Sequence, residues 1–175
     1  MLQIFYSTLQ KQSRLDDTSQ SLGGYISTNS FQNNKLNSVF PILYDRDKSQ
    51  CRLLILKNSA TTEKSIILSL STDSTKTTFS YGLVSPGVDD CNTLFFETIE
   101  DYTDPLYTTF SPIEEESSFT IEPQQCIGIW VKRHKLENIT PPTEDIDPLD
   151  KCKVSLIEEV NKDLVENFNI RIEIL

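Results

Sequence analysis

The chain is short of the residues from which catalytic and metal sites are most often built. His134 is its only histidine, so no site that needs two imidazoles can form. The four cysteines, at positions 51, 91, 126 and 152, are widely separated and form no C-x-x-C pair, which argues against a zinc knuckle or a thiol redox motif. The sequence therefore predicts a protein that is not an enzyme, with no catalytic residue, metal site or cofactor.

Long apolar runs and basic residues are also scarce. No stretch approaches the roughly 20 apolar residues of a membrane span, and Met1 to Gln10 lacks the pattern of a secretory signal. We therefore expect synthesis in a cytoplasm, free cysteine thiols and no membrane partner. With 26 Asp and Glu against 16 Lys and Arg, the formal net charge is −10, which argues against nucleic acid as the principal partner.

One stretch, Gln125 to Arg133, shows the clearest structure. Its residues alternate with the two-residue period of a strand: positions 126, 128, 130 and 132 face one way, and positions 127, 129, 131 and 133 face the other. The only tryptophan, Trp130, lies here among β-branched residues. Because both sets are largely apolar, we expect a central strand that is covered on both faces.

Other short strands follow the same logic. Apolar or alternating runs at residues 2–9, 22–27, 52–57, 65–71, 77–84 and 119–121 are separated by polar turns, and Pro41 marks 39–43 as an edge strand or a connection. This pattern predicts an all-β fold, an antiparallel β-sandwich of the immunoglobulin-like or jelly-roll-like kind. The predicted core contains Trp130, Ile127, Ile129, Leu54, Ile55 and Leu68.

The pattern changes near the C-terminus. Residues 138–150 contain three prolines and several acids and are predicted to be a linker after a sandwich domain at 1–137. In the extension at 151–175, helical spacing predicts a short amphipathic helix over Val154–Glu166. Ile170 to Leu175 alternates again, as a last strand or as a tail that pairs with a neighbouring subunit.

Several candidate sites stay weak. The pair Gly23-Gly24 precedes neither a helix pattern nor a lysine, which argues against a phosphate site. Asp145 and Asp147 offer oxygen ligands for calcium, but the run lacks the glycine and the later glutamate of an EF-hand loop. Paired carboxylates such as those of Glu114–Glu116 leave a hydrolase open as a weaker interpretation. The basic cluster Lys132–Lys135 is interpreted as the charged exit of a core strand.

Four segments together resemble small structural proteins of tailed bacteriophages: Leu22–Ser27, Val39-Phe40, Cys51–Asn58 and Pro123–Arg133. The similar features are a strand with a glycine pair, an apolar strand that contains Arg and ends in Asn, and a Gly-x-Trp-x-x-Arg strand after a proline turn. The resemblance spans residues 22–134, and the chain departs from the pattern after Asn138.

This resemblance implies a non-enzymatic virion protein of the neck, tail or capsid surface. Its partners would be other virion proteins and further copies of the chain. The residues expected at subunit contacts are Lys132, Arg133, Leu164, Phe168 and Ile172. An alternative from another class is a module that binds carbohydrate or a host surface. In it, Tyr102, Tyr107 and Phe110 of an acidic surface loop predicted at Glu100–Glu116 would stack on sugars.

Overall fold

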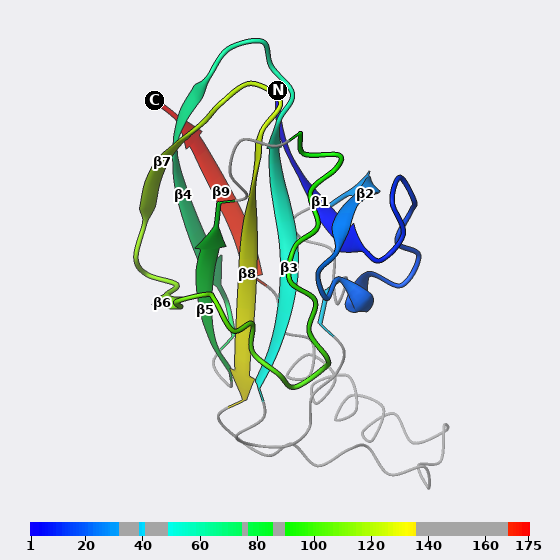
Figure 1. The fold of residues 1–175 in the computed structure, drawn as a ribbon. Helices are drawn as coiled ribbons and strands as arrows, with labels where there is room; N and C mark the ends of the chain where they lie inside the picture. The colour runs from blue at the N-terminus through cyan, green and yellow to red at the C-terminus, as the bar shows by residue number, and fades with distance from the viewer. Residues whose placement is uncertain (32–38, 41–48, 75–76, 86–89, 136–167) are drawn as a thin grey trace, which may run out of the picture.

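The computed structural model describes residues 1–31, 39–40, 49–74, 77–85, 90–135 and 168–175. These residues form two antiparallel sheets that face each other (Figure 1). The predicted helix at Val154–Glu166, the linker at 138–150, Leu164, Cys152 and the acids Asp145 and Asp147 lie outside the described residues. The all-β prediction is confirmed for the part that is described.

The larger sheet has the strand order β2-β1-β3-β8-β5-β6, and the smaller has the order β7-β4-β9. The strands are β1 (Leu2–Thr8), β2 (Tyr25–Ser30), β3 (Ser49–Asn58), β4 (Lys64–Thr72), β5 (Thr77–Val84), β6 (Ser111–Pro112), β7 (Ser117–Ile121), β8 (Cys126–Lys135) and β9 (Phe168–Ile174). A short 3-10 helix, η1 (Thr18–Gln20), precedes β2.

β8 is the central strand that its alternation predicts. It lies between β3 and β5, with Leu54 opposite Ile129 on one side and Gly82 opposite Trp130 on the other. Its inward residues Ile127, Ile129 and Val131 join the core between the sheets, whereas Cys126 and Trp130 join a second apolar cluster on the outer face. The strand is thus apolar on both faces because something covers each of them.

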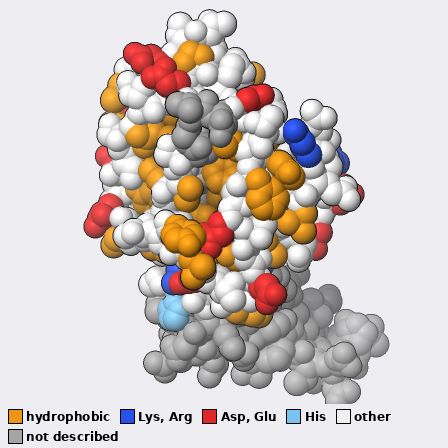
Figure 2. Space-filling view, in the orientation of Figure 1, with side chains coloured by type: hydrophobic (Ala, Val, Ile, Leu, Met, Phe, Trp, Pro, Cys, Tyr) orange, Lys and Arg blue, Asp and Glu red, His pale blue; other side chains and the backbone are white. Residues whose placement is uncertain are grey.

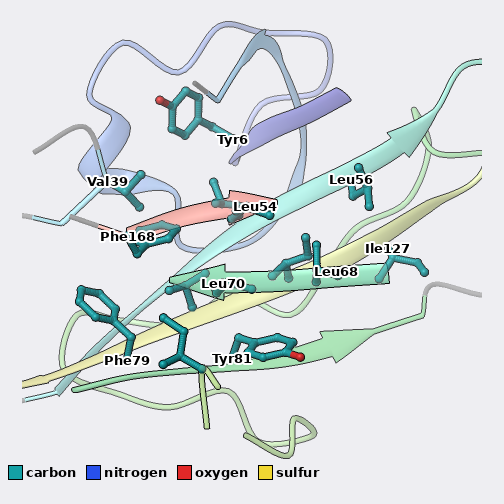
Figure 3. Packing of buried hydrophobic residues seen from close by; sticks show 14 of the residues in the cluster. Tyr6, Val39, Leu54, Leu56, Leu68, Leu70, Phe79, Tyr81, Ile127 and Phe168 are labelled. Carbon is teal, nitrogen blue, oxygen red and sulfur yellow. The ribbon is translucent and has the colours of Figure 1, made fainter. Parts of the chain in front are cut away.

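The main core fills the space between the two sheets. Figure 3 shows Leu54 and Leu56 of the larger sheet directed toward Leu68 and Leu70 of β4. Phe168, at the start of β9, packs against Phe79 with ring centroids 5.6 Å apart. All six predicted core residues are buried, and five of them are at most 1% exposed.

β9 belongs to the sandwich. It pairs with β4 over seven residues, from Thr72 opposite Phe168 to Ile66 opposite Ile174. Residues 168–174 are therefore part of the same two-sheet unit as β4, which agrees with the first alternative for Ile170 to Leu175, a last strand. Ile170 and Phe168 face inward because β4 presents Leu70 and Leu68 on that face.

Candidate functional site

The outer face of the larger sheet carries a long covering segment, residues 90–110. It packs Cys91 and Phe96 onto Leu53, Ile55 and Trp130, and this group forms the second apolar cluster. The sequence predicts a surface loop at Glu100–Glu116, and the structure shows irregular chain already from residue 90, whose inner side is core. We call residues 97–107 of this segment the docking loop.

The glycine pair holds the start of this segment. Gly24 and Phe96 exchange backbone hydrogen bonds, with N···O distances of 3.2 and 2.9 Å. Gly23 has a φ of +107°, and a Cβ at this position would collide with the carbonyl of Glu97. Both glycines are therefore required by the close passage of a neighbouring backbone, a role that the sequence analysis did not foresee.

Three carboxylates then fix the docking loop. Asp101 Oδ1 accepts a hydrogen bond from Arg52 Nη1 at 3.1 Å, and its carboxylate also accepts from Gln50 Nε2. Asp104 accepts from Lys132 Nζ and from the Cys51 thiol. Glu97 Oε1 accepts from the backbone N–H of Leu106 at 2.8 Å. Two carboxylates thus attach the loop to the sheet, and the third ties its two ends together.

A tight turn sets the direction of Asp101. Thr103 N–H donates to the carbonyl of Glu100 at 3.2 Å, and Tyr102 adopts a left-handed φ of 64°. A non-glycine residue rarely takes this conformation unless its surroundings impose it. The turn places the Asp101 carboxylate at the edge of β3, beside the end of the buried Arg52 side chain.

The two arginines of the central strands are buried, although the sequence analysis interpreted the cluster Lys132–Lys135, which includes Arg133, as the charged exit of a core strand. Arg52 and Arg133 are each 0% exposed, and their guanidinium carbons lie 5.6 and 4.9 Å from the centre of the Phe40 ring. Arg133 Nη2 donates to Gln50 Oε1 at 2.6 Å, so Gln50 links Arg133 to Asp101. Within the described part of the chain, Nε and Nη2 of Arg52 have no hydrogen-bond acceptor.

This burial changes the predicted contact residues. Arg133 and Phe168 are core residues and cannot form a surface contact. Ile172 packs partly against the main core, and Lys132 is paired with Asp104 of its own chain. The inward register of β8 and β9 is the reason, since a two-residue period places Arg133 on the same face as Ile129.

The cysteines in this region are chemically quiet. Burial, together with the neighbouring Asp104 carboxylate, raises the pKa of the Cys51 thiol. The hydrogen bond with Cys91 is the main cause that raises the pKa of the Cys126 thiol, and burial is the second cause. Both thiols stay protonated near neutral pH, so they are poor nucleophiles and poor metal ligands. Cys51, Cys91 and Cys126 are free, as the sequence predicts, and all three are buried.

Other candidate sites find little support in the described residues. There, no group of three His, Cys, Asp or Glu side chains could hold a metal ion, and no helix is long and apolar enough to cross a membrane. Glu114, Glu115 and Glu116 are exposed on the connection between β6 and β7. A groove of about 550 Å³ beside the start of β5 is lined by Ser and Thr residues and by the apolar side chains of Phe79, Phe110 and Ile113.

The docking loop exposes apolar groups on its outer side. Leu106 and Tyr107 are adjacent and are 81% and 89% exposed, and Tyr102 is 53% exposed. Pro105, next to them, is buried. Figure 2 shows hydrophobic side chains gathered on this face with Asp and Glu among them. The arrangement presents bulky apolar groups from a loop that is held in place.

Comparison with known proteins gives no family: no family model, no curated protein and no solved structure matches this chain.

Proposed function

We propose that this protein is a non-enzymatic assembly component whose docking loop binds another protein. One observation carries the proposal: Leu106 and Tyr107 are almost fully exposed at the end of a loop that three carboxylates hold in one conformation. A single exposed apolar residue is ordinary on a protein surface. Two adjacent exposed apolar residues on a fixed loop are better suited to binding than a single one, because little conformational entropy of the loop is lost when a partner covers them.

The size of the effect is suited to a binding contact. Fully burying a large apolar side chain is favourable by about 1.5–3 kcal/mol, so Leu106 and Tyr107 together supply roughly 3–6 kcal/mol of gross apolar stabilisation. Binding energy in protein interfaces is concentrated in a few such residues, with Tyr among the most frequent. The pair can therefore serve as the centre of an interface.

We further propose a tailed-phage virion as the setting, at the neck, the tail or the capsid surface, with other virion proteins and copies of the chain as partners. The support is the resemblance of residues 22–134, together with the two packed antiparallel sheets. The buried, protonated cysteines fit a structural role and offer no nucleophile.

Light scattering and co-expression test this proposal on the full chain. The chain is produced with the capsid, neck and tail proteins of the genome that encodes it, and the mass of each complex is measured. We expect a defined oligomer or a complex with one of these proteins, which Leu106→Ser with Tyr107→Ser disrupts. Leu9→Ser is the matched control, since Leu9 is 69% exposed and lies outside the docking loop. A strict monomer that binds none of these proteins would overturn the proposal.

A glycan-binding module is the second candidate, and the exposure of Tyr102 and Tyr107 favours it. An exposed tyrosine ring can stack on the apolar face of a sugar. Phe110 is the third aromatic residue of the predicted set. The centre of its ring lies 5.2 Å from Lys132 Nζ, and the side chain packs partly against the second apolar cluster. Binding on a glycan array that Tyr107→Ala abolishes and Leu106→Ser leaves intact would select this candidate over protein docking.

A further inference from the structure

The net charge of the chain is concentrated in one continuous region. Between Lys76 and Lys132 there is no Lys or Arg, while the acids in this interval are Asp89, Asp90, Glu97, Glu100, Asp101, Asp104, Glu114, Glu115, Glu116 and Glu122. These ten acids equal the formal net charge of −10, since the other 16 of the 26 acids are matched by 16 Lys and Arg. The acidic interval contains the docking loop and the connection between β6 and β7.

Four of these ten acids, Glu97, Glu100, Asp101 and Asp104, lie in the docking loop. Within the described residues, the docking loop receives two cations from the strands beneath it, namely Arg52 on Asp101 and Lys132 on Asp104. Glu100, also in the loop, is exposed, as are Glu114, Glu115 and Glu116. The docking loop that presents Leu106 and Tyr107 is therefore acidic, with four carboxylates, of which those of Asp101 and Asp104 are paired with cations.

From this placement we infer that the docking loop binds a protein surface with an apolar recess bordered by Lys and Arg side chains. The inference rests on the proposed function and adds the chemistry of the partner. Leu106 and Tyr107 would enter the recess, and the surplus carboxylates would face its cationic border. A nucleic acid or an anionic lipid surface would be repelled by the same carboxylates.

Charge complementarity of this kind mainly raises the rate of association. Complementary surfaces speed diffusional encounter, and salt weakens the effect because the screening length is about 8 Å at 0.15 M ionic strength. The apolar pair would determine how slowly the complex dissociates. The charge contribution can therefore be measured from the salt dependence of binding, and the apolar contribution from substitutions of Leu106 and Tyr107.

Two synthetic amphipathic peptides serve as probes. Both are helices of about 18 residues, or five turns, with the same leucine face; one has lysine and the other glutamate at every remaining position. Their binding to the full chain is followed by fluorescence anisotropy at about 50 and 300 mM salt, within the range where screening changes strongly. We expect the lysine peptide to bind, with affinity falling at least threefold in the higher salt, and the glutamate peptide not to bind.

Matched variants separate the apolar contribution from the charge contribution. Leu106→Ser should weaken binding of the lysine peptide about tenfold, equivalent to 1.4 kcal/mol, and Leu9→Ser should change it less than twofold. Glu100→Lys should weaken binding and flatten its salt dependence. Glu63→Lys makes the same change of charge at an exposed acid outside the interval and should do neither.

Equal binding of the two peptides, or equal effects of Glu100→Lys and Glu63→Lys, would overturn the inferred partner chemistry. The proposed function is tested separately with the co-encoded partner. If Leu106→Ser with Tyr107→Ser disrupts that complex while Glu100→Lys and salt do not, docking stands and the basic border is wrong. If the double variant leaves the complex intact, the docking function itself is refuted.

Discussion

The ion pair between Asp101 and Arg52 joins the docking loop to the sandwich, and its removal gives the sharpest test of the structure. The two side chains differ in environment: that of Arg52 is 1% exposed, and that of Asp101 is 37% exposed. Asp101→Ala leaves the guanidinium buried without its anion and also removes an acceptor for Gln50. The loop then loses its main attachment to β3.

The expected magnitude follows from these exposures. Removing one partner of a fully buried ion pair costs about 3–5 kcal/mol, and exposed pairs contribute little. Because Asp101 is partly in water, we place the cost of Asp101→Ala at about 2 kcal/mol, which includes the lost hydrogen bond from Gln50. Asp101→Asn keeps an acceptor and should cost about half as much.

A double-mutant cycle with Arg52→Met isolates the pair. In the Arg52→Met background no cation remains at this position to be compensated, so Asp101→Ala should cost only about 1 kcal/mol. Urea unfolding is read from the fluorescence of Trp130, the only tryptophan, which is 1% exposed beneath the covering segment. Asp16→Ala is the control, since the Arg14–Asp16 pair has side chains that are 71% and 91% exposed. If Asp101→Ala behaves like the control, or if its cost is equal in both backgrounds, the reasoning is refuted.

Three further predictions concern the same face. Gly23→Ala should lower the free energy of unfolding by more than about 2 kcal/mol, because Gly23 has a positive φ and a Cβ there would collide with the Glu97 carbonyl. Gly128→Ala should lower it by about 1 kcal/mol, because its new Cβ would lie 2.8 Å from the Phe96 ring. Equal shifts in thermal midpoint for the two variants would contradict this. The free energy of unfolding should fall as pH rises above about 9, because the thiols ionise there in the unfolded chain while Cys51 and Cys126 stay protonated in the folded protein. Each thiol contributes a slope of up to about 1.4 kcal/mol per pH unit. Urea titrations at pH 8 to 10 should show a shallower slope for Cys51→Ala. Iodoacetamide at pH 8 should modify Cys91 and Cys126 only after unfolding, and peptide mass mapping of native protein with both modified would contradict their burial.

The sequence by itself determined the strands and the fold class. Alternation at Gln125–Arg133 and at Ser65–Ser71 predicted β8 and β4 to within two residues of their observed bounds, because the period of a strand depends on local geometry. Continuous apolar runs such as Leu53–Leu56 correctly predicted central strands. The burial of Trp130 followed from the same pattern.

Only the tertiary structure decided which surface is exposed. Nothing local distinguishes Arg133, which is buried beside Phe40, from a charged strand end in water, since the difference lies in packing by distant residues. Likewise, Phe96 and Leu106 are both apolar residues of one acidic segment, yet one is 5% and the other 81% exposed. The contacts that β3 makes with Asp101 and Asp104 join residues 49 and 53 positions apart, and contacts over such separations depend on how the whole chain folds.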